Sequence, residues 1–448
     1  MFLKIILMSL ISLNMGEDMS VKQYTLNNGL KLIVKEVKDI TAVYIIAGFK
    51  VGMYCYEPRN KVNISHYVEH MLFKGTEKRK VGEIAKEIER MGGYLNGFTA
   101  DWGTAYLMQV PFDKVEYALE INADAVMHST FPENEVIKEK EVILHELKGW
   151  LDDPYSFLFH RLLELVFEVH NYGIPHESLL ISHNNLTRED LVKWYRKYYK
   201  PNNMVLVVVG NVNSDDIYRK VKELYKDFKP SKIDWYRCSQ EPPQKEVRVK
   251  VYKGDINKVY VGIAFRGVKE GHPDVYGLRL IANILGGGHS SRLDMKIVEN
   301  KKLASNIFAM MYPQLDDGTL LIGFETEEDK VKEAIEEVLR EIKNLKENGV
   351  TQDELKLSKK MFKVNYILSN ERISNQGIKI LKGTIMFDDP EFYDKYVKKI
   401  EEVSLSEIRK IANEYLISSN LSMVVYYPKN AQKILQEKDL KRIIGEVF

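Results

Sequence analysis

The segment SHYVEHMLF, residues 65–73, holds the side chains whose types and spacing could do chemistry. On a helix, positions four apart share a face, so His66 and His70 can both present imidazole nitrogens to one metal ion. Glu69 lies three residues after His66 and leans over the same point without being placed on the ion. A general base belongs there, within one hydrogen bond of a water held at the metal. The spacing therefore predicts a metal site in which Glu69 takes a proton from water.

An ordinary surface helix with two histidines and a salt-bridging glutamate is the alternative interpretation of this segment. With 10 histidines and 64 acidic residues in 448, the pattern H-x-x-E-H arises by chance in about one such chain in thirty. Met71, Leu72 and Phe73 follow the pattern and predict a half-buried helix, where a glutamate between two histidines needs a cation as its partner. The order H-x-x-E-H, the reverse of the commoner H-E-x-x-H, is the inverzincin signature.

A catalytic zinc has three protein ligands and an open fourth position, so the two histidines need a third ligand from elsewhere. The predicted helix IKEKEVILHELKGW offers Glu139, Glu141 and Glu146. Glu139 and Glu146 are seven residues apart and share a face, whereas His145 is turned away from that face. Spacing alone does not choose between these carboxylates, and a solvated acidic helix face is the alternative for all of them. Two histidines and a glutamate suit zinc, although manganese or cobalt could occupy the same site.

Length and composition bound the class of protein. The 448 residues predict two or three domains, and 45% hydrophobic with 29% charged residues is ordinary for a globular chain. The net charge of +1 gives no reason to expect nucleic acid or an anionic membrane as a partner. Two cysteines, Cys55 and Cys238, argue against a disulfide framework and exclude a zinc site built from cysteines alone. They fit a reducing compartment, so we expect a cytoplasmic protein.

The N-terminal extension, residues 1–19, raises the one question about targeting. Lys4 precedes a short apolar run that cannot span a bilayer, and no A-x-A-like cleavage site follows it. One interpretation is a weak export signal. The other, favoured by the two acidic residues where cleavage would occur, is that translation begins at Met15 or Met19. No other stretch is apolar for long enough to cross a bilayer, so we expect no stable membrane insertion.

The first folded unit begins and ends with strand signals. Asn28-Gly29 between alternating apolar residues predicts a hairpin whose two turn positions both have positive φ. A helix that begins at Thr187, with Asp190 three residues on as a capping-box partner, leads into the buried strand MVLVVVG. Between these signals the patterns predict a strand region and four helices, around residues 41–54, 64–74, 80–91, 112–127 and 132–150.

The second half repeats the endings of the first. Residues 403–428 can be laid over 186–211 at a constant offset of 217, which places Ser404 on Thr187 and Asn420 on Asn203. This indicates a duplicated unit, with the chance pairing of two amphipathic helices and strands as the alternative. The other predicted elements are two strands and three helices, around residues 245–254, 258–267, 276–285, 326–347 and 352–368.

Two other features carry no predicted chemistry. GGGHSS, residues 286–291, follows a helix pattern and lacks a P-loop lysine, so we expect a helix end and a tight loop rather than a phosphate site. The histidines at positions 160, 170, 176 and 183 have no ligand spacing and are expected at the surface or in packing.

We therefore expect an α+β fold of two similar domains, each a mainly antiparallel sheet packed with helices. A zinc-binding domain would span residues 20–228, a proline-containing linker 229–247 and a C-terminal domain 248–448. The C-terminal domain contains no H-x-x-E-H and is expected to have no metal site, which predicts one zinc per chain.

These segments, in this order, resemble peptidase family M16, the group of pitrilysin, insulinase and the mitochondrial processing peptidases. The resemblance runs from about residue 20 to 430 and rests on AGFKVGMYCYEP, HYVEHMLFKGT, MGGYLNGFTA, EKEVILHELK, LTREDLVKWYRKYYKPNNMVLVVVG and GGGHSSRL. It implies that Glu146, 76 residues after His70, is the third zinc ligand and that Glu139 orients a ligand. It also implies that Asn96 binds the substrate backbone.

The sequence departs from the family pattern at three positions. Arg292, in the S-R-L motif, resembles the family arginine that helps to hold the substrate carbonyl, but the tyrosine that usually accompanies it is Ser305 here. Half of that contact is therefore missing from this chain. Asn63 stands where glycine is usual and Gly97 where alanine is usual, and neither change threatens the metal.

The resemblance implies a zinc-dependent endopeptidase that hydrolyses peptides or unfolded polypeptide segments with Glu69 as general base. It also implies a dimer, either of identical chains or with a paralogous subunit that supplies the Arg/Tyr pair but lacks zinc. One rival interpretation is a non-catalytic scaffold subunit, which has no need of a base over an open metal site. The other is a binding protein with a structural zinc, which requires a fourth protein ligand that the sequence does not offer.

Overall fold

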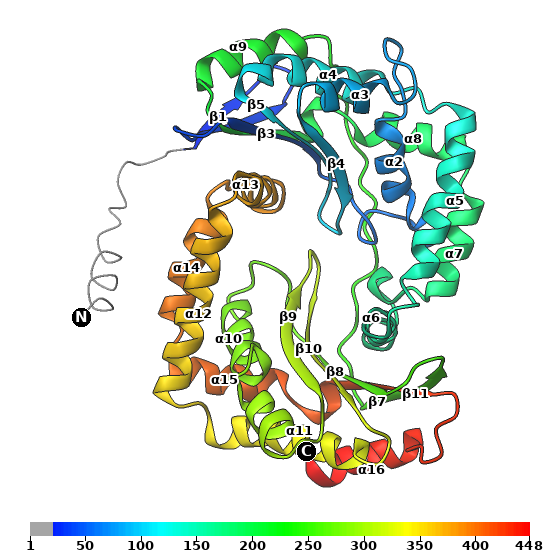
Figure 1. Cartoon of the computed structure of the whole chain (residues 1–448), viewed down its shortest axis with the longest axis vertical. Helices are drawn as coiled ribbons and strands as arrows, with labels where there is room; N and C mark the ends of the chain where they lie inside the picture. Colours follow the sequence, from blue (N-terminus) through cyan, green and yellow to red (C-terminus); the bar gives the residue numbers. More distant parts are fainter. Residues whose placement is uncertain (1–20) are drawn as a thin grey trace.

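The computed structural model describes residues 21–448, which form two lobes, each a sheet covered by helices (Figure 1). The predicted α+β architecture of two similar domains is confirmed. The predicted N-terminal extension, residues 1–19, lies outside the described residues. No helix in the described part of the chain is both long and apolar enough to cross a membrane.

The first lobe contains a six-stranded sheet in which only β2 and β6 run parallel. In spatial order its strands are β1 (Lys22–Thr25), β2 (Lys31–Glu36), β6 (Met204–Gly210), β3 (Ala42–Phe49), β5 (Thr104–Pro111) and β4 (Tyr94–Thr99). The helices of this half of the chain are η1 (Arg59–Lys61), α2 (Ile64–Leu72), α3 (Glu83–Arg90), η2 (Phe112–Lys114), α4 (Val115–His128), α5 (Glu133–Gly149), α6 (Pro154–Val166), η3 (Asn171–Gly173), α7 (His176–Asn185), α8 (Arg188–Tyr198), η4 (Pro201–Asn203) and α9 (Ser214–Leu224).

The second lobe contains a five-stranded sheet in which only β7 and β11 run parallel. In spatial order its strands are β7 (Arg248–Gly254), β11 (Leu421–Pro428), β8 (Val259–Arg266), β10 (Gly318–Thr326) and β9 (Asn306–Pro313). The helices of this half are α10 (Val275–Gly286), η5 (Asp294–Asn300), α11 (Val331–Asn348), α12 (Gln352–Asn370), α13 (Ile373–Phe387), α14 (Phe392–Glu402), α15 (Leu405–Tyr415), η6 (Ser418–Asn420) and α16 (Glu437–Val447).

The predicted duplication is confirmed strand by strand. With β1 set aside, the order β2-β6-β3-β5-β4 corresponds to β7-β11-β8-β10-β9, and the parallel pair falls at the same place. Thr187 and Ser404 each close a capping box at the start of α8 and α15. Asn203 and Asn420 each donate a side-chain hydrogen bond of 2.8 Å to the carbonyl five residues earlier. The same local chemistry therefore ends both helices before the central strand.

Each half of the chain lends one helix to the sheet of the other half (Figure 1). Helix α6, from the first half, packs on β8 and β11, where the Phe157 ring stacks on Tyr426 with ring centroids 4.1 Å apart. Helix α13, from the second half, packs on β3 and β6 and places Leu381 against Gly48. Because of this exchange, apolar side chains are buried on both faces of each sheet, and the two lobes share their cores.

The segment predicted as a linker, residues 229–247, has almost no regular secondary structure but is held against the first lobe. The Trp235 ring lies 5.6 Å from the Tyr56 ring, measured between centroids. The Glu241 carboxylate accepts hydrogen bonds from the backbone N–H groups of Val169 and His170, both at 2.8 Å. These contacts fix the segment at the junction of the two lobes.

Two local predictions need correction. The hairpin at Asn28-Gly29 forms, but only Gly29 has positive φ, at 87°. The Asn28 side chain instead donates hydrogen bonds to the carbonyls of Tyr225 and Phe228, which ties the turn to the end of the first half. The helix predicted from about residue 326 begins at Val331, because β10 extends to Thr326.

The exchange of α13 makes a testable prediction about stability. Leu381 is fully buried between α13 and the first sheet, so Leu381→Ala should lower the free energy of unfolding by about 2–5 kcal/mol through lost burial and a cavity. Leu368→Ala on α12 is the matched control, because that side chain is 55% exposed and its loss should change stability by about 0.5 kcal/mol or less. Chemical denaturation followed by circular dichroism measures both. Equal effects of the two variants would contradict the packing of α13 on the sheet.

Candidate metal centre

Helix α2, which contains the H-x-x-E-H pattern, begins on a buried carboxylate. Glu57 is completely buried and accepts hydrogen bonds from the backbone N–H groups of Ser65, Asn63 and Tyr54, at 2.7, 2.9 and 3.1 Å. Burial raises the pKa of Glu57 to about 7, while these N–H donors and the positive end of the helix favour its ionised form. Asn63, just before the helix, has a φ of 81°, a left-handed conformation that asparagine tolerates better than most residues. That conformation explains why asparagine can stand where glycine is usual.

The predicted ligands come together as α2 packs on α5. His66 Nε2 and His70 Nε2 are 3.2 Å apart, and Glu146 Oε2 lies 3.9 and 3.6 Å from them. A point equidistant from these three atoms lies about 2.1 Å from each, the length of a zinc–nitrogen or zinc–oxygen bond. The three side chains therefore fit a zinc ion. Glu146 is 43% exposed, so the side of the triad away from α2 is open.

A chain of hydrogen bonds sets the tautomer of His66. His183 Nε2 lies 3.0 Å from the Lys140 carbonyl, and its Nδ1 lies 3.1 Å from the amide nitrogen of Asn63. The Asn63 side-chain oxygen is then free to accept from His66 Nδ1, 3.1 Å away. With its proton on Nδ1, His66 presents a bare Nε2 to the metal. Burial, together with His70 and His183, lowers the pKa of His66 to about 3, which keeps the ring neutral.

His70 is oriented by the predicted acid. Its Nδ1 lies 3.0 Å from Glu139 Oε2, and Lys74 binds the other oxygen of the same carboxylate. Burial raises the pKa of Glu139, but the hydrogen bonds from Lys74 and His70 outweigh burial and lower it overall. An ionised Glu139 holds the proton on Nδ1 and leaves His70 Nε2 for the metal.

Glu69 lies beside the triad rather than in it. Its Oε2 is 3.9 Å from His66 Nε2 and accepts a hydrogen bond of 3.4 Å from the Thr99 hydroxyl. Burial raises its pKa to about 7. A β-carbon added at Gly97, on β4, would lie 2.4 Å from Glu69 Oε1. The glycine at a position where alanine is usual thus gives this carboxylate room.

The triad opens into a cavity of about 840 Å³ between the two lobes. Asn96, on β4, lines the cavity, and its binding of the substrate backbone stays a prediction. Strand β4 pairs only with β5, so its other edge is free along this wall. Tyr312 and Gln314, from the second half, line the opposite side. The remaining aromatic lining residues are Tyr54, Phe73, Phe98, Trp150, Phe159 and His160.

Two protein-family models match the chain between residues 41 and 362. A family model described as insulinase, peptidase family M16, matches residues 41–177, and one described as the peptidase M16 inactive domain matches residues 185–362. The chain belongs to peptidase family M16. The first match contains the whole triad, and the second covers a region without H-x-x-E-H, in agreement with the description of that domain as inactive.

Two curated M16 relatives and one solved structure match nearly the whole chain. The uncharacterized zinc protease YmxG of Bacillus subtilis is 29% identical over 91% of this chain and 98% of its own length. The zinc protease PqqE of Helicobacter pylori is 27% identical over 94% of this chain and 98% of its own. The crystal structure of a protease from Helicobacter pylori has a TM-score of 0.83 and 25% identity, covering 91% of this chain and 99% of that one.

Arg292, named from the M16 pattern, does not line the cavity of its own chain. It forms a two-pronged ion pair with Glu354, with nitrogen–oxygen distances of 2.6 and 2.8 Å, and also contacts Glu341. Ser305, at the usual tyrosine position, hydrogen-bonds to Glu325 at 2.8 Å. Neither side chain reaches the triad within one chain, so a role of Arg292 in substrate binding stays a prediction.

The M16 site also depends on residues that the sequence did not single out. Glu57 and His183 are far from the pattern along the chain and carry no spacing signal. Thr99 lies on β4, close to Asn96. Lys74 lies two residues past the end of α2, where no helical spacing links it to His70, and its side chain reaches the Glu139 carboxylate that also contacts His70. His145, weighed as a ligand, is exposed on α5.

The role of Glu139 can be tested by metal affinity. Glu139→Gln should weaken zinc binding by about 10–100-fold, because the neutral amide no longer holds the His70 tautomer. Glu141→Gln, an exposed position two residues along the same helix, should leave the affinity unchanged. Competition with a chromophoric chelator measures both. Equal zinc affinities of the two variants would show that Glu139 does not orient the ligand.

Proposed function

We propose that this chain is a zinc-dependent endopeptidase that hydrolyses peptides or unfolded polypeptide segments. One observation carries the proposal: His66, His70 and Glu146 converge on a point at zinc-bond distance, with Glu69 beside them and a large cavity in front. The relatives named zinc proteases support it. A structural zinc would need a fourth protein ligand, and within residues 21–448 only three donor side chains, those of His66, His70 and Glu146, gather at this point.

The residues divide the chemistry between them. A zinc ion in this triad would supply Lewis acidity, lowering the pKa of a water and polarising a peptide carbonyl. Glu69 takes the proton of the attacking water and passes it to the leaving amine. Asn63 and His183 fix His66, and Glu139 fixes His70, so that both imidazoles keep their Nδ1 protons and face the site with Nε2.

The substrate would bind as an extended strand. The free edge of β4 runs along the cavity wall and offers backbone hydrogen bonds, which give affinity with little demand on sequence. Asn96 would add a side-chain contact to the substrate backbone. Phe73, Trp150 and Phe159 would contact its apolar side chains. A folded domain does not fit a cavity of about 840 Å³, so the substrate would be a peptide or an unfolded segment.

We also propose that the chain works as a dimer. The second subunit is either an identical chain or a paralogous one. In a homodimer this chain cleaves by itself. In a heterodimer a paralogous subunit supplies the Arg/Tyr pair, which the position of Arg292 and the serine at 305 favour, since neither reaches the triad in one chain. A non-catalytic scaffold is the remaining alternative, and the half-buried Glu69, held beside the triad by Thr99, argues against it.

The base assignment predicts a separation of metal binding from catalysis. Glu69→Gln should keep wild-type zinc content, because Glu69 is not a ligand, and should lower hydrolysis of a quenched, unstructured peptide by about 10²–10⁴-fold. Glu141→Gln on the exposed face of α5 is the matched control and should cleave like wild type.

Three outcomes decide between the alternatives. A Glu69→Gln variant that cleaves at the wild-type rate contradicts the proposed base. Full activity from the wild-type chain alone rules out an obligate paralogous partner. Zinc-loaded wild type that cleaves only after addition of a paralogous M16 subunit supports the heterodimer, and no cleavage with any such subunit supports a scaffold.

A further inference from the structure

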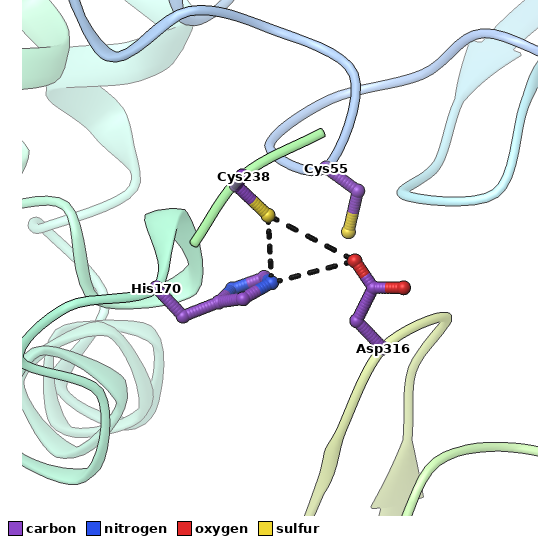
Figure 2. Close-up of side chains that lie close together, drawn as sticks. All are labelled: Cys55, His170, Cys238 and Asp316. Carbon is purple, nitrogen blue, oxygen red and sulfur yellow. Dashed lines mark hydrogen bonds and ion pairs between the residues drawn. The ribbon is translucent and has the colours of Figure 1, made fainter. Parts of the chain in front are cut away.

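A second group of metal-binding side chains lies outside the triad, at the junction of the two lobes. Figure 2 shows Cys55, His170, Cys238 and Asp316 facing one another from four separate segments. They come, in that order, from the loop between β3 and α2, the turn after α6, the segment between α9 and β7, and the turn between β9 and β10. No two of them are close in sequence, so the fold alone brings them together.

The donor atoms are spaced like the corners of a tetrahedral site. Cys238 Sγ lies 2.8 Å from His170 Nε2 and 3.8 Å from Asp316 Oδ2, and the last two atoms are 3.5 Å apart. With Cys55 Sγ included, all four atoms lie within 4.8 Å of one another. A tetrahedral zinc with ordinary bond lengths places its ligand atoms roughly 3.3–3.8 Å apart. Among Cys238, His170 and Asp316, only the Cys238–His170 distance is shorter than this range, and binding an ion would lengthen it.

The chemistry of the four donors also fits one ion. Two thiolates, an imidazole and a carboxylate are ligand types that zinc accepts, and four protein ligands leave no open position. Cys55 and His170 are buried, Cys238 is half-buried and Asp316 is 37% exposed. The protein therefore shields the donor atoms from solvent except on the side of Asp316. A disulfide would involve only Cys55 and Cys238, and a thiolate–imidazole pair only Cys238 and His170. A bound metal ion would account for all four side chains.

Tyr172 makes the contacts that metal binding would have to change. Its backbone N–H donates to His170 Nδ1 at 3.1 Å, which leaves the ring proton on Nε2, facing Cys238. Its hydroxyl accepts from the Cys55 thiol at 3.0 Å. Both contacts therefore require a proton on the side chain, on His170 Nε2 in the first case and on Cys55 Sγ in the second. On binding a metal, Cys55 and Cys238 would both release their thiol protons to solvent, the His170 proton would move to Nδ1, and the contact with the Tyr172 N–H would lengthen.

We propose that Cys55, His170, Cys238 and Asp316 bind a second zinc-type ion, in a closed structural site. The site is independent of the catalytic proposal, since it shares no residue with the His66 triad. It raises the expected content from one zinc per chain to two. It also changes the interpretation of His170 from a packing residue to a ligand, and it gives the second half of the chain a ligand in Asp316.

The position of the site suggests what it does. Tyr54 precedes Cys55 directly, Gln314 lies two residues before Asp316, and both line the catalytic cavity from opposite lobes. Asp101 already links the same places, because its carboxylate accepts from the Leu315 N–H at 2.6 Å and from the Tyr172 hydroxyl at 3.0 Å. An ion held by residues of both lobes would fix the distance between two walls of the cavity.

Cobalt reports on this site separately from the triad, because only cysteine ligands give thiolate-to-cobalt charge-transfer absorption. We would titrate the full chain, reduced and freed of metal, with Co²⁺ alone. The wild type and a His66→Ala/His70→Ala variant should both develop the band, and Cys238→Ser should lose it. Asp316→Asn should weaken Co²⁺ binding by about tenfold or more. Ser239→Ala, the exposed neighbour of Cys238, is the control and should match wild type.

The outcomes separate this site from the catalytic one. Zinc content of the protein as purified should be two per wild-type chain, and one in the His66→Ala/His70→Ala variant and in Cys238→Ser. Absence of the cobalt band in reduced wild type with two free thiols would overturn the proposal, as would a band that survives Cys238→Ser. A Cys55–Cys238 disulfide in the purified protein, with no Co²⁺ uptake after its reduction, would overturn it too. If Cys238→Ser fails to fold, the band of the His66→Ala/His70→Ala variant still decides.

Discussion

The buried contact between α2 and α5 is the interaction on which the rest of the site depends. A zinc triad needs lone pairs from two helices to meet within a few tenths of an ångström, and side chains alone do not achieve that. Here the inner faces of the helices are closed by Tyr67, Met71, Ile143 and Leu147, all fully buried. Apolar packing between these faces fixes the two helices. His66 and His70 on α2, and Glu146 on α5, lie at the edge of this contact.

The exchange of α6 and α13 provides the second constraint. The cavity has one wall in each lobe, so its width is set by how the lobes are joined. Two separate domains on a flexible linker would leave that width undefined, whereas here each sheet is covered by a helix of the other half. The contacts of Glu241 and Asp101 hold the junction at the same place. The fold thus presents the edge of β4 and the triad to one open cavity between the lobes.

Sequence reasoning succeeded where the signal is local. His66, Glu69 and His70 lie within one and a half turns of helix, and the duplicated capping boxes recur at one offset, so both could be predicted. The choice of Glu146 over Glu139 and Glu141 needed the family resemblance, because periodicity says which face of a helix is buried but not what it meets. For the same reason no pattern in α6 or α13 could reveal that they pack on the other sheet.

The residues that orient the ligands escaped prediction for a related cause. His183 acts on His66 through Asn63, which is 120 positions from His183 and three from His66 in the sequence. No spacing rule connects these residues. Nothing in the sequence around Glu57 distinguishes it from a surface glutamate, because its burial depends on the fold of the loop before α2. The two cysteines are 183 positions apart and carry no metal-ligand spacing, and their meeting with His170 and Asp316 depends on the junction of the lobes.

The central claim is that His66, His70 and Glu146 hold one zinc with an open fourth position. X-ray diffraction at the zinc absorption edge, from crystals of the full chain, tests it most directly. We expect an anomalous peak about 2.0–2.2 Å from His66 Nε2, His70 Nε2 and a Glu146 oxygen, with no fourth protein ligand. Zinc-loaded crystals with no peak at the triad, or with a fourth side chain bound there, would contradict it.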